Sequence, residues 1–598
     1  MAAARLHQIS NHFEIPNMNG HASHMNGNGT RPVYNVRDQP LGTPKPIRIV
    51  CIGAGVSGIN LVRTLRLNLT GYEIEVYEKN EKVGGTWFEN RYPGCRCDVP
   101  SHCYQYSWRP NKDWSNFFAP AQEIGDYLHQ VCEEENIMDS IRLRHQVTAA
   151  WWDESRGVWG LKVLDLQTGV EFDDEANFLI NACGILNNWK WPEVDGLLDF
   201  TGDLVHTAAW PKDLDLTDKN VVVIGNGASG IQLLPAIQRD VKKLYHVVRT
   251  PTWIPPPWRQ TQLMTGGGQM LKEINLDEEE NFTPEQIQRF KDDIDFYTRF
   301  VKGIEKDTSG NFRVVVKDGP IQGMASAKTR EYMTLLLGGD ERLCKALIPD
   351  FPIGTRRMTP APGYLEALRR DNVEVVTGNI QRFVTDGIQM ESGEDLKVDV
   401  IICATGFDLS FCPRFPLIGR EGDLRDAWSD ETPRAYMSCA VAGMPNYFTF
   451  LGPNAPIGHG SVFTLSEHIA RYIVRALKKC QTEHIRALAP TQDAVDDYNE
   501  HITHFMPRTA WAAPGRSWFK AGKEDGPVVA LHPGSRVHFF HMLEQFRGED
   551  FEYVYDGAED ETGKVKQNRF AYLGNGFSVR ELDSSFDSTW YLSESAVV

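Results

Sequence analysis

A strand–glycine turn–helix–strand pattern that occurs twice constrains the fold more than any other feature. In the first copy, the apolar run 48–52 leads into Gly53-Ala-Gly-Val-Ser-Gly58, a helical pattern covers 59–68, and a second strand-like run ends at Glu78. Such glycines permit a tight turn, which places a helix N-terminus against a pyrophosphate. The acid at the end of the second strand can accept a hydrogen bond from a ribose hydroxyl. The predicted cofactor contacts of this unit are Gly53, Gly55, Gly58 and Glu78.

The second copy differs from the first at its last position. The run 220–224 precedes Gly225-Asn-Gly-Ala-Ser-Gly230, and the following strand-like run, 243–248, ends at Arg249. A carboxylate at that position would repel a ribose 2′-phosphate, whereas a guanidinium can bind one with two N–H groups. We therefore expect FAD in the first unit and NADPH in the second. The predicted contacts of the second unit are Gly225, Gly227, Ser229, Gly230, Arg249 and Thr250.

Residues 257–350 interrupt this alternation of strands and helices. Thr283-Pro-Glu-Gln286 combines an N-cap, a proline in the first turn and a capping-box glutamine. Apolar residues at 287, 290, 294, 297 and 301 continue at helical spacing, which predicts one amphipathic helix in a helical insertion that shapes the substrate cavity.

The expected fold class is α/β, with two Rossmann-like dinucleotide-binding domains, for FAD and NADPH, and a helical insertion in the second. The expected boundaries are a disordered leader (1–45), the first part of the FAD domain (46–190), a linker (191–211), the first part of the NADPH domain (212–256), the insertion (257–350), the second part of the NADPH domain (351–390), the second part of the FAD domain (391–520) and a C-terminal extension (521–598).

Composition narrows the possible partners. The net charge of −18 argues against nucleic acid and anionic membranes, and the apolar runs are too short to cross a bilayer. The 11 cysteines are scattered, which is typical of reduced thiols in the cytoplasm. Cys95, Cys97 and Cys103 lie near His102, but their spacing fits no usual zinc site, so no metal is expected. We expect a monomer.

Three further motifs surround the two glycine turns. Gly84-Gly-Thr-Trp87 and Tyr92-Pro-Gly94 with Asp98 follow the first unit, and the consecutive glycines let the backbone approach a flat ring system. Phe200, Gly202, His206, Trp210 and Pro211 form the pattern FxGxxxHxxxWP between the two units. Ala404-Thr-Gly-Phe-Asp408 follows a late strand-like run.

In this order, the motifs resemble those of the type I Baeyer–Villiger monooxygenases. The match covers residues 46 to about 410 and becomes looser to about 520. The pattern at 200–211 discriminates best, because related N-hydroxylating and sulfur-oxidising flavoproteins share both glycine turns but typically lack the Trp-Pro ending. The resemblance implies that NADPH reduces FAD and that one atom of dioxygen is inserted beside a ketone carbonyl to give an ester or lactone.

The resemblance also assigns roles to residues. Gly354-Thr-Arg-Arg357 is similar to a family segment whose last arginine is catalytic, and Asp98 matches the aspartate that positions this arginine. It implies that Arg356 and Arg249 hold the 2′-phosphate, and that Gly202, His206 and Trp210 couple the two domains without acting as acid or base. The remaining expected cofactor contacts are Gly85, Thr86, Trp87, Asp98, Tyr104 and Trp511.

Several readings stay open at this stage. Arg357 could instead bind phosphate or lie at the surface, Trp511 could be a core residue, and His459 could belong to the substrate side or to a structural loop. Segments 452–460, 514–520 and 573–576 resemble fungal secondary-metabolism members, which implies a bulky ketone of polyketide or terpenoid origin. Alternatives are hydroxylation, epoxidation or sulfur oxidation by the same kind of enzyme, and a redox sensor without turnover.

Overall fold

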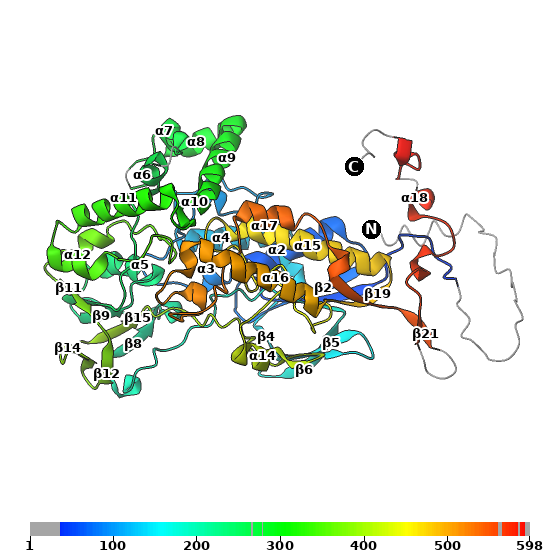
Figure 1. Cartoon of the computed structure of the whole chain (residues 1–598), viewed down its shortest axis with the longest axis horizontal. Coiled ribbons are helices and arrows are strands. Elements are labelled where there is room, and N and C mark those ends of the chain that lie inside the picture. Colours follow the sequence, from blue (N-terminus) through cyan, green and yellow to red (C-terminus); the bar gives the residue numbers. More distant parts are fainter. Residues whose placement is uncertain (1–35, 265–266, 278, 560–564, 584–585, 593–598) are drawn as a thin grey trace, which may run out of the picture.

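The computed structural model describes residues 36–264, 267–277, 279–559, 565–583 and 586–592. It confirms the α/β class and contains two parallel sheets, which lie in different parts of an elongated molecule (Figure 1). The helical insertion predicted at 257–350 is also observed, as seven helices of the described chain. They are α6 (Trp258–Met264), α7 (Gln269–Ile274), α8 (Pro284–Asp292), α9 (Ile294–Gly310), α10 (Phe312–Val315), α11 (Pro320–Leu336) and α12 (Glu341–Leu347).

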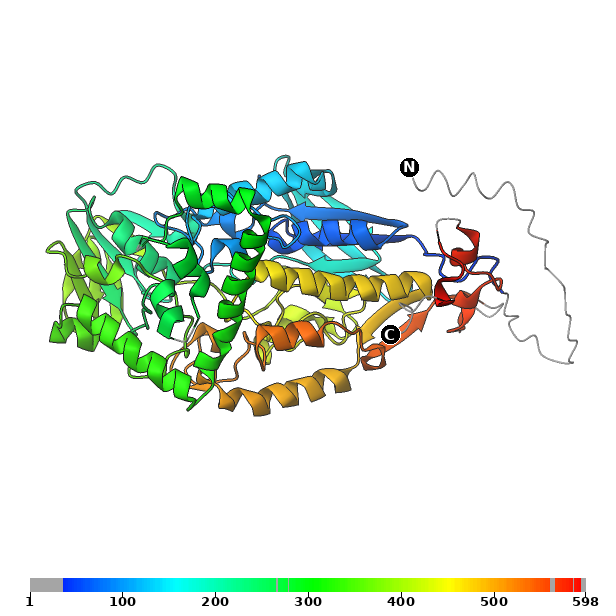
Figure 2. The same ribbon diagram turned by 90° about the horizontal axis from the view of Figure 1, so that it is seen from above.

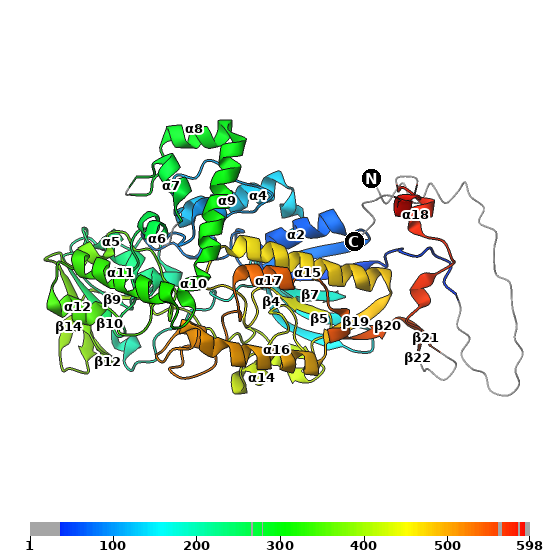
Figure 3. The same cartoon turned by 45° about the horizontal axis from the view of Figure 1, so that its top comes forward.

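The first parallel sheet forms the core of the N-terminal dinucleotide unit. Its order is β18-β7-β1-β2-β3, and every neighbouring pair is parallel. The strands are β1 (Ile47–Ile52), β2 (Tyr72–Glu78), β3 (Ile141–Leu143), β7 (Phe178–Asn181) and β18 (Tyr447–Thr449). Helix α2 (Val56–Asn68) follows the glycine turn and packs beside the long helix α15 (Val462–Thr482), as Figure 3 shows.

The second parallel sheet has the order β11-β10-β9-β15-β8. Its strands are β8 (Asp203–His206), β9 (Asn220–Ile224), β10 (Lys243–Val248), β11 (Val373–Thr377) and β15 (Val400–Cys403), and helix α5 (Ala228–Ile237) follows its glycine turn. The chain therefore leaves the first sheet after β7, builds the second sheet, and returns to add β18 to the first. In Figure 2 the second sheet lies at the left of the molecule and the first near its centre.

The insertion departs from the sequence prediction at one point. The single amphipathic helix expected from Thr283 onward is two helices, α8 and α9, because the backbone at Asp293 leaves helical geometry (φ −113°, ψ 89°). The capping box at Thr283 and Gln286 is present as predicted. The carboxylate of Asp293 starts α9 by accepting the N–H of Phe296, and Ile294, expected on the buried face, is 58% exposed.

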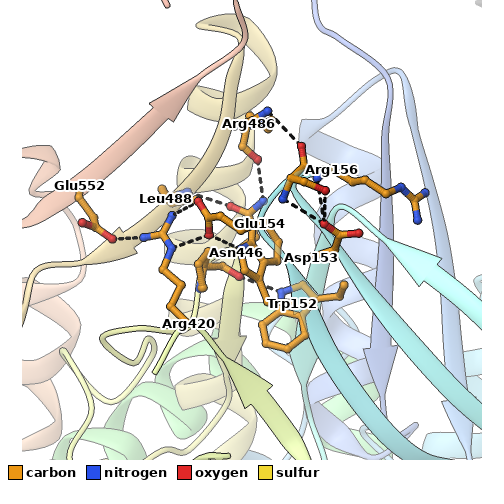
Figure 4. A network of polar contacts seen from close by, with 12 residues as sticks. Trp152, Asp153, Glu154, Arg156, Arg420, Asn446, Arg486, Leu488 and Glu552 are labelled. Carbon is orange, nitrogen blue, oxygen red and sulfur yellow. Dashed lines mark hydrogen bonds and ion pairs between the residues drawn. The ribbon is translucent and has the colours of Figure 1, made fainter. Parts of the chain in front are cut away.

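A mixed sheet that the sequence patterns do not predict lies beside the first unit, with the order β17-β16-β4-β5-β6, and all its pairs are antiparallel except β16 with β4. Its strands are β4 (His145–Asp153), β5 (Val158–Asp165), β6 (Glu171–Ala176), β16 (Leu417–Gly419) and β17 (Gly422–Asp423). Arg420 ties this sheet to its surroundings, since it donates from Nε and Nη2 to Glu154 (2.7 and 3.0 Å) and pairs with Glu552 on β20 (Phe551–Tyr555) (Figure 4).

The remaining elements cover the sheets or extend beyond them. They are α3 (Thr86–Glu89), α4 (Ala121–Glu134), α13 (Tyr364–Ala367), α14 (Leu424–Asp430), α16 (Gln492–Phe505), α17 (Arg536–Met542), α18 (Val579–Leu582), the three-stranded sheet β12 (Ile380–Val384), β13 (Gly387–Met390) and β14 (Asp395–Lys397), and the strands β19 (Ile485–Pro490), β21 (Gly557–Glu559) and β22 (Val565–Gln567). None of the helices described is long and apolar enough to span a membrane.

The N-terminal residues 36–45, expected to belong to a disordered leader, lie against the C-terminal extension. The amide of Leu41 donates to the carbonyl of Phe577 (2.7 Å), and the amide of Asn575 donates to the carbonyl of Gln39 (3.0 Å). The rest of the expected leader, residues 1–35, lies outside the described residues.

His102 anchors the insertion to the first unit through an aromatic cage. The rings of Phe282, Phe290, Tyr297 and Phe300 surround the imidazole at centroid distances of 4.8 to 5.6 Å. Burial lowers the pKa of His102 to about 3, so the ring stays neutral in the folded protein.

This neutral histidine makes the fold sensitive to acid. Below a pH of about 6.5 the unfolded chain protonates residue 102 while the folded chain does not, so stability is lost as the pH falls from about 6.5 toward 3. We expect His102→Phe to reduce this loss. The check is the free energy of unfolding by urea at several pH values for both proteins; parallel pH dependences would contradict the assignment.

Candidate functional site

Both glycine turns are closed by the same steric contacts. A methyl group at Gly53 would lie 2.7 Å from the carbonyl oxygen of Ala182, and one at Gly58 would lie 2.0 Å from that of Gly53. In the second turn the corresponding distances are 2.6 Å, from Gly225 to Ala404, and 2.0 Å, from Gly230 to Gly225. Side chains are thus excluded at equivalent positions of both turns, as the sequence pattern predicts.

The middle glycines of the two turns differ in what covers them. A methyl group at Gly55 would meet Gly85 Cα at 3.6 Å, and Gly85 itself has a left-handed φ of +53°. The Gly-Gly-Thr-Trp segment therefore lies directly over the first turn. A methyl group at Gly227 would meet no protein atom within 4 Å, so the second turn is open at that point.

Glu78 is a buried carboxylate at the end of β2. It accepts the backbone N–H of Ala54 and that of Asn80, each at 2.8 Å, and burial raises its pKa. Each carboxylate oxygen has a further lone pair, so the group fits a ribose hydroxyl and disfavours a ribose phosphate.

Two arginines meet at the corresponding end of the second unit. Arg249 follows β10 and is exposed, and burial, followed by the charge of Arg249, lowers the pKa of Arg356. Arg356 donates from Nη2 to the carbonyl of Arg516 (2.7 Å), and neither arginine forms an ion pair within the described residues. Two neighbouring cations without a carboxylate are the donor set that a phosphate requires.

Arg357 and Asp98, predicted from distant parts of the sequence, form a two-point ion pair. Nε and Nη2 of Arg357 donate to the two carboxylate oxygens at 2.5 and 2.7 Å, and Nη1 donates to the carbonyl of Ile457 at 2.6 Å. The side chains are 25% and 17% exposed. Burial opposes the charged guanidinium, but Asp98 outweighs it and raises the pKa of Arg357, so the arginine stays charged.

Aromatic side chains pack near this pair. Tyr104 is buried and packs edge-on against Trp87 (5.4 Å) and Phe463 (4.9 Å). Trp511 is only 3% exposed and lies 5.8 Å from the ring of Phe312, which favours the packing role that the sequence left open.

Two threonines were also predicted to contact cofactors. Thr86 is exposed at the start of α3, and Thr250 is half-buried after Arg249.

The linker histidine is held rather than free. His206 ends β8, stacks on Trp189 (4.7 Å), and accepts the N–H of Ala208 through Nδ1 (3.1 Å). Its Nε2 lies 3.4 Å from Thr405 Oγ1, in the Ala-Thr-Gly-Phe-Asp motif, and burial lowers its pKa to about 4. A ring in this state is neutral near pH 7 and makes a poor general base.

The other linker residues are fixed by the second unit. A methyl group at Gly202 would lie 2.4 Å from the carbonyl of Asp399, so this position requires glycine for packing. Trp210 packs against the core of the second unit.

Three of the sequence motifs meet at one cavity of about 260 Å³. It lies where the first unit faces the linker. Its lining residues are Lys79, Asn80, Phe88, Glu89, Arg91, Asn187, Trp189, Ala208, Ala209, Trp210 and Phe407. The linker residues Ala208, Ala209 and Trp210 thus share this cavity with Lys79 and Asn80, which follow Glu78 in the sequence.

The sequence reasoning missed the contacts that join the domains. Tyr92 donates to the side chain of Gln232 on α5 (2.8 Å), and a methyl group at Gly94 would lie 2.6 Å from the carbonyl of Gln232. The Tyr-Pro-Gly turn was therefore the available signal for a docking point. The Ile457 carbonyl, by contrast, has no signature, because any residue supplies a backbone acceptor.

The site has the features of a protein that binds two dinucleotides. These features are two parallel sheets with closed glycine turns, opposite charges at the ribose positions, and a paired arginine nearby.

A profile of NAD(P)-binding Rossmann-like domains matches residues 51–121. The FAD-binding monooxygenase tazF of Aspergillus terreus is 36% identical, over 92% of this chain and 96% of its own length. A Baeyer-Villiger monooxygenase of Pseudomonas aeruginosa is 32% identical, over 83% of this chain and 90% of its own length.

The solved structures agree with these relatives. Cyclohexanone monooxygenase from Rhodococcus sp. Phi1 bound to NADP+ superimposes with a TM-score of 0.72 at 26% identity, covering 86% of this chain and all of that one. The chain belongs to the FAD-binding monooxygenases, with Baeyer–Villiger enzymes among its relatives. It is a flavoprotein monooxygenase that uses FAD and NADP.

The second turn offers a matched pair of substitutions. Gly230→Ala forces a methyl group to 2.0 Å from a backbone oxygen and is expected to lower stability by about 1–3 kcal/mol. Gly227→Ala places its methyl group in open space at an ordinary φ of −76°, so its melting temperature should equal that of the wild type. We expect both variants to bind NADPH more weakly in a fluorescence titration. Equal melting temperatures for the wild type, Gly227→Ala and Gly230→Ala would contradict the steric explanation.

Proposed function

We propose that this protein catalyses Baeyer–Villiger oxidation of a bulky ketone, with FAD in the first unit and NADPH in the second. One oxygen atom of dioxygen enters the bond beside the carbonyl, the other leaves as water, and NADPH supplies two electrons. The observation that carries the proposal is the ion pair of Arg357 with Asp98.

The charges at the two ribose positions support this placement of the cofactors. Buried Glu78 would repel a 2′-phosphate in the first unit, whereas Arg249 and Arg356 form a cationic pair beside the second. The backbone of Gly53, Gly55 and Gly58 would hold the FAD pyrophosphate, and that of Gly225, Gly227 and Gly230 the NADPH pyrophosphate. FAD, once reduced, would supply the activated oxygen.

Arg357 has unused hydrogen-bond donors for the reaction. A guanidinium carries five N–H groups, of which Asp98 takes two and Ile457 one. The two that remain, on Nη1 and Nη2, can donate to the negative charge that develops on the oxidant and on the former carbonyl oxygen. Asp98 fixes the orientation of the fork and offsets the cost of burying its charge.

The substrate class rests on resemblance. The loop 452–460 was expected to resemble fungal secondary-metabolism enzymes, and fungal relatives reach 38% identity, against 32% for the bacterial Baeyer-Villiger enzyme. These similarities support a ketone of polyketide or terpenoid origin. Hydroxylation, epoxidation or sulfur oxidation would give products without an oxygen inserted beside the carbonyl, which mass spectrometry with labelled dioxygen distinguishes.

Replacing the catalytic arginine tests the proposal. We expect Arg357→Ala to keep NADPH oxidation, with dioxygen reduced to hydrogen peroxide, and to lower ester formation by roughly a hundredfold or more. The control is Arg425→Ala, which removes an arginine that also pairs with an aspartate at two points, Asp423, away from the site. Ester formation by Arg357→Ala at the wild-type rate would falsify the assignment.

His206 is proposed to couple the domains, because its ring connects the linker to Thr405 and Trp189. We expect His206→Ala to retain bound FAD but to lose most product formation, by about tenfold, with kcat and KM changing together. Since the wild-type ring is neutral, the two proteins should share one pH profile between about pH 6 and 8. Full ketone turnover by the variant would rule out this role.

A further inference from the structure

The loop Gly452–Gly460 contacts two arginines through residues near its C-terminal end. The carbonyl of Ile457 accepts from Nη1 of Arg357 (2.6 Å), and two residues later Nε2 of His459 accepts the backbone N–H of Arg536 (3.3 Å). Arg536 begins α17 and has no counterpart among the motifs of the sequence. The loop therefore connects the proposed catalytic arginine to a second arginine from the C-terminal region.

Arg536 is a fully buried cation with one carboxylate partner among the residues that the structure describes. Its side chain is 2% exposed, and Nη2 lies 2.7 Å from Oε1 of Glu305 on α9 and 2.5 Å from Oγ1 of Thr464 on α15. The ion pair thus joins α17 to the helical insertion, and the hydrogen bond joins it to the helix that follows the loop.

The guanidinium also fixes the end of the loop by contact. A methyl group at Gly460 would lie 2.2 Å from Nη1 of Arg536, and Gly460 has a left-handed φ of +76°. This Nη1 is buried without a hydrogen-bond partner among the described residues. Loss of Glu305 would leave the cation without its counter-ion, which is costly in a buried position.

His459 lies between the two cations as a neutral group. Burial, followed by the charges of Arg536 and Arg357, lowers its pKa to about 3. Because its Nε2 accepts an N–H, the proton of the neutral ring is on Nδ1. The ring can therefore accept the backbone N–H of Arg536 without adding a third positive charge beside the two arginines.

We propose that Arg536 and Glu305 are positioning residues for Arg357: their ion pair holds the loop Gly452–Gly460, and the loop holds the third hydrogen bond of the catalytic guanidinium. Asp98 fixes two N–H groups of Arg357 and the Ile457 carbonyl fixes a third, which leaves one N–H on Nη1 and one on Nη2 for the reaction. The inference rests on the proposed function of Arg357.

The ion pair also relates the insertion to the chemistry. Glu305 belongs to the helical insertion, whereas Arg357 follows the insertion in sequence and the loop belongs to the first unit. A change in the position of α9 would thus reach Arg357 through Arg536 and the loop. The part of the chain expected to form the substrate cavity is in this way connected to the catalytic charge.

The test compares Glu305→Gln and Arg536→Lys in the holoenzyme. We expect both to lower kcat for ester formation by roughly ten- to a hundredfold, with little change in the KM for ketone, and to raise the hydrogen peroxide formed per NADPH. Hydrogen–deuterium exchange should increase in the peptide covering 452–460. If Arg536→Lys does not fold, Glu305→Gln alone tests the proposal, because glutamine keeps the shape of the glutamate side chain and removes only its charge.

Controls separate this inference from the function it rests on. Arg475→Lys removes an arginine that ties α15 to the Leu543 carbonyl (2.6 Å) without touching the loop, and it should change neither exchange nor product yield. In an Arg357→Ala background, Glu305→Gln should cause no further loss of ester. Wild-type coupling and exchange in Glu305→Gln, with ester lost in Arg357→Ala, would overturn the inference alone. Ester formation by Arg357→Ala would overturn the proposed function itself.

Discussion

The ion pair between Arg357 and Asp98 is the interaction on which the arrangement of this protein depends. A guanidinium this enclosed is tolerated only beside a carboxylate, and the two residues come from segments separated by the whole helical insertion. Their pairing therefore requires the first and second units to stay docked. The Tyr-Pro-Gly turn supports the same docking, since Tyr92 hydrogen-bonds to Gln232 on the first helix of the second unit. Charge, and not only apolar packing, sets the relative position of the two cofactor units.

The two units show how one scaffold is made specific. Their turns share steric contacts to within 0.1 Å, yet one strand ends in a buried carboxylate and the other in an exposed arginine. The first turn is also covered by Gly85, whereas the second is open at Gly227. The common part provides backbone N–H groups for any pyrophosphate, and the divergent part selects which nucleotide fits. The same division explains why a general NAD(P)-binding profile matches the first unit although Glu78 disfavours a 2′-phosphate.

The sequence predicts what steric rules and side-chain charge determine. The glycine turns, the acid at the end of β2, the capping box at Thr283 and the proximity of Arg357 to Asp98 all follow from local pattern or from resemblance, and the structure has each of them. The break at Asp293 was missed because the apolar spacing continues across it, and only the φ and ψ angles distinguish one helix from two. Strands of two or three residues, such as β16 and β17, are too short to show a period. Arg536 carried no motif, and its importance depends on burial, which distant segments create.

The return of the chain to the first sheet has a consequence for how the protein is made. In the folded protein strand β18 pairs with β7, and the hydroxyl of Tyr447 accepts a hydrogen bond from Asn181 (3.0 Å). Neither contact can form until the entire second unit has been synthesised, because β18 follows that unit in the sequence. Until then β7 has an unpaired edge, which is a site for wrong association. The domain that emerges first from the ribosome is therefore the last to be completed. Its closing strand depends on a pairing of high contact order, which slows folding, so this edge needs protection during synthesis.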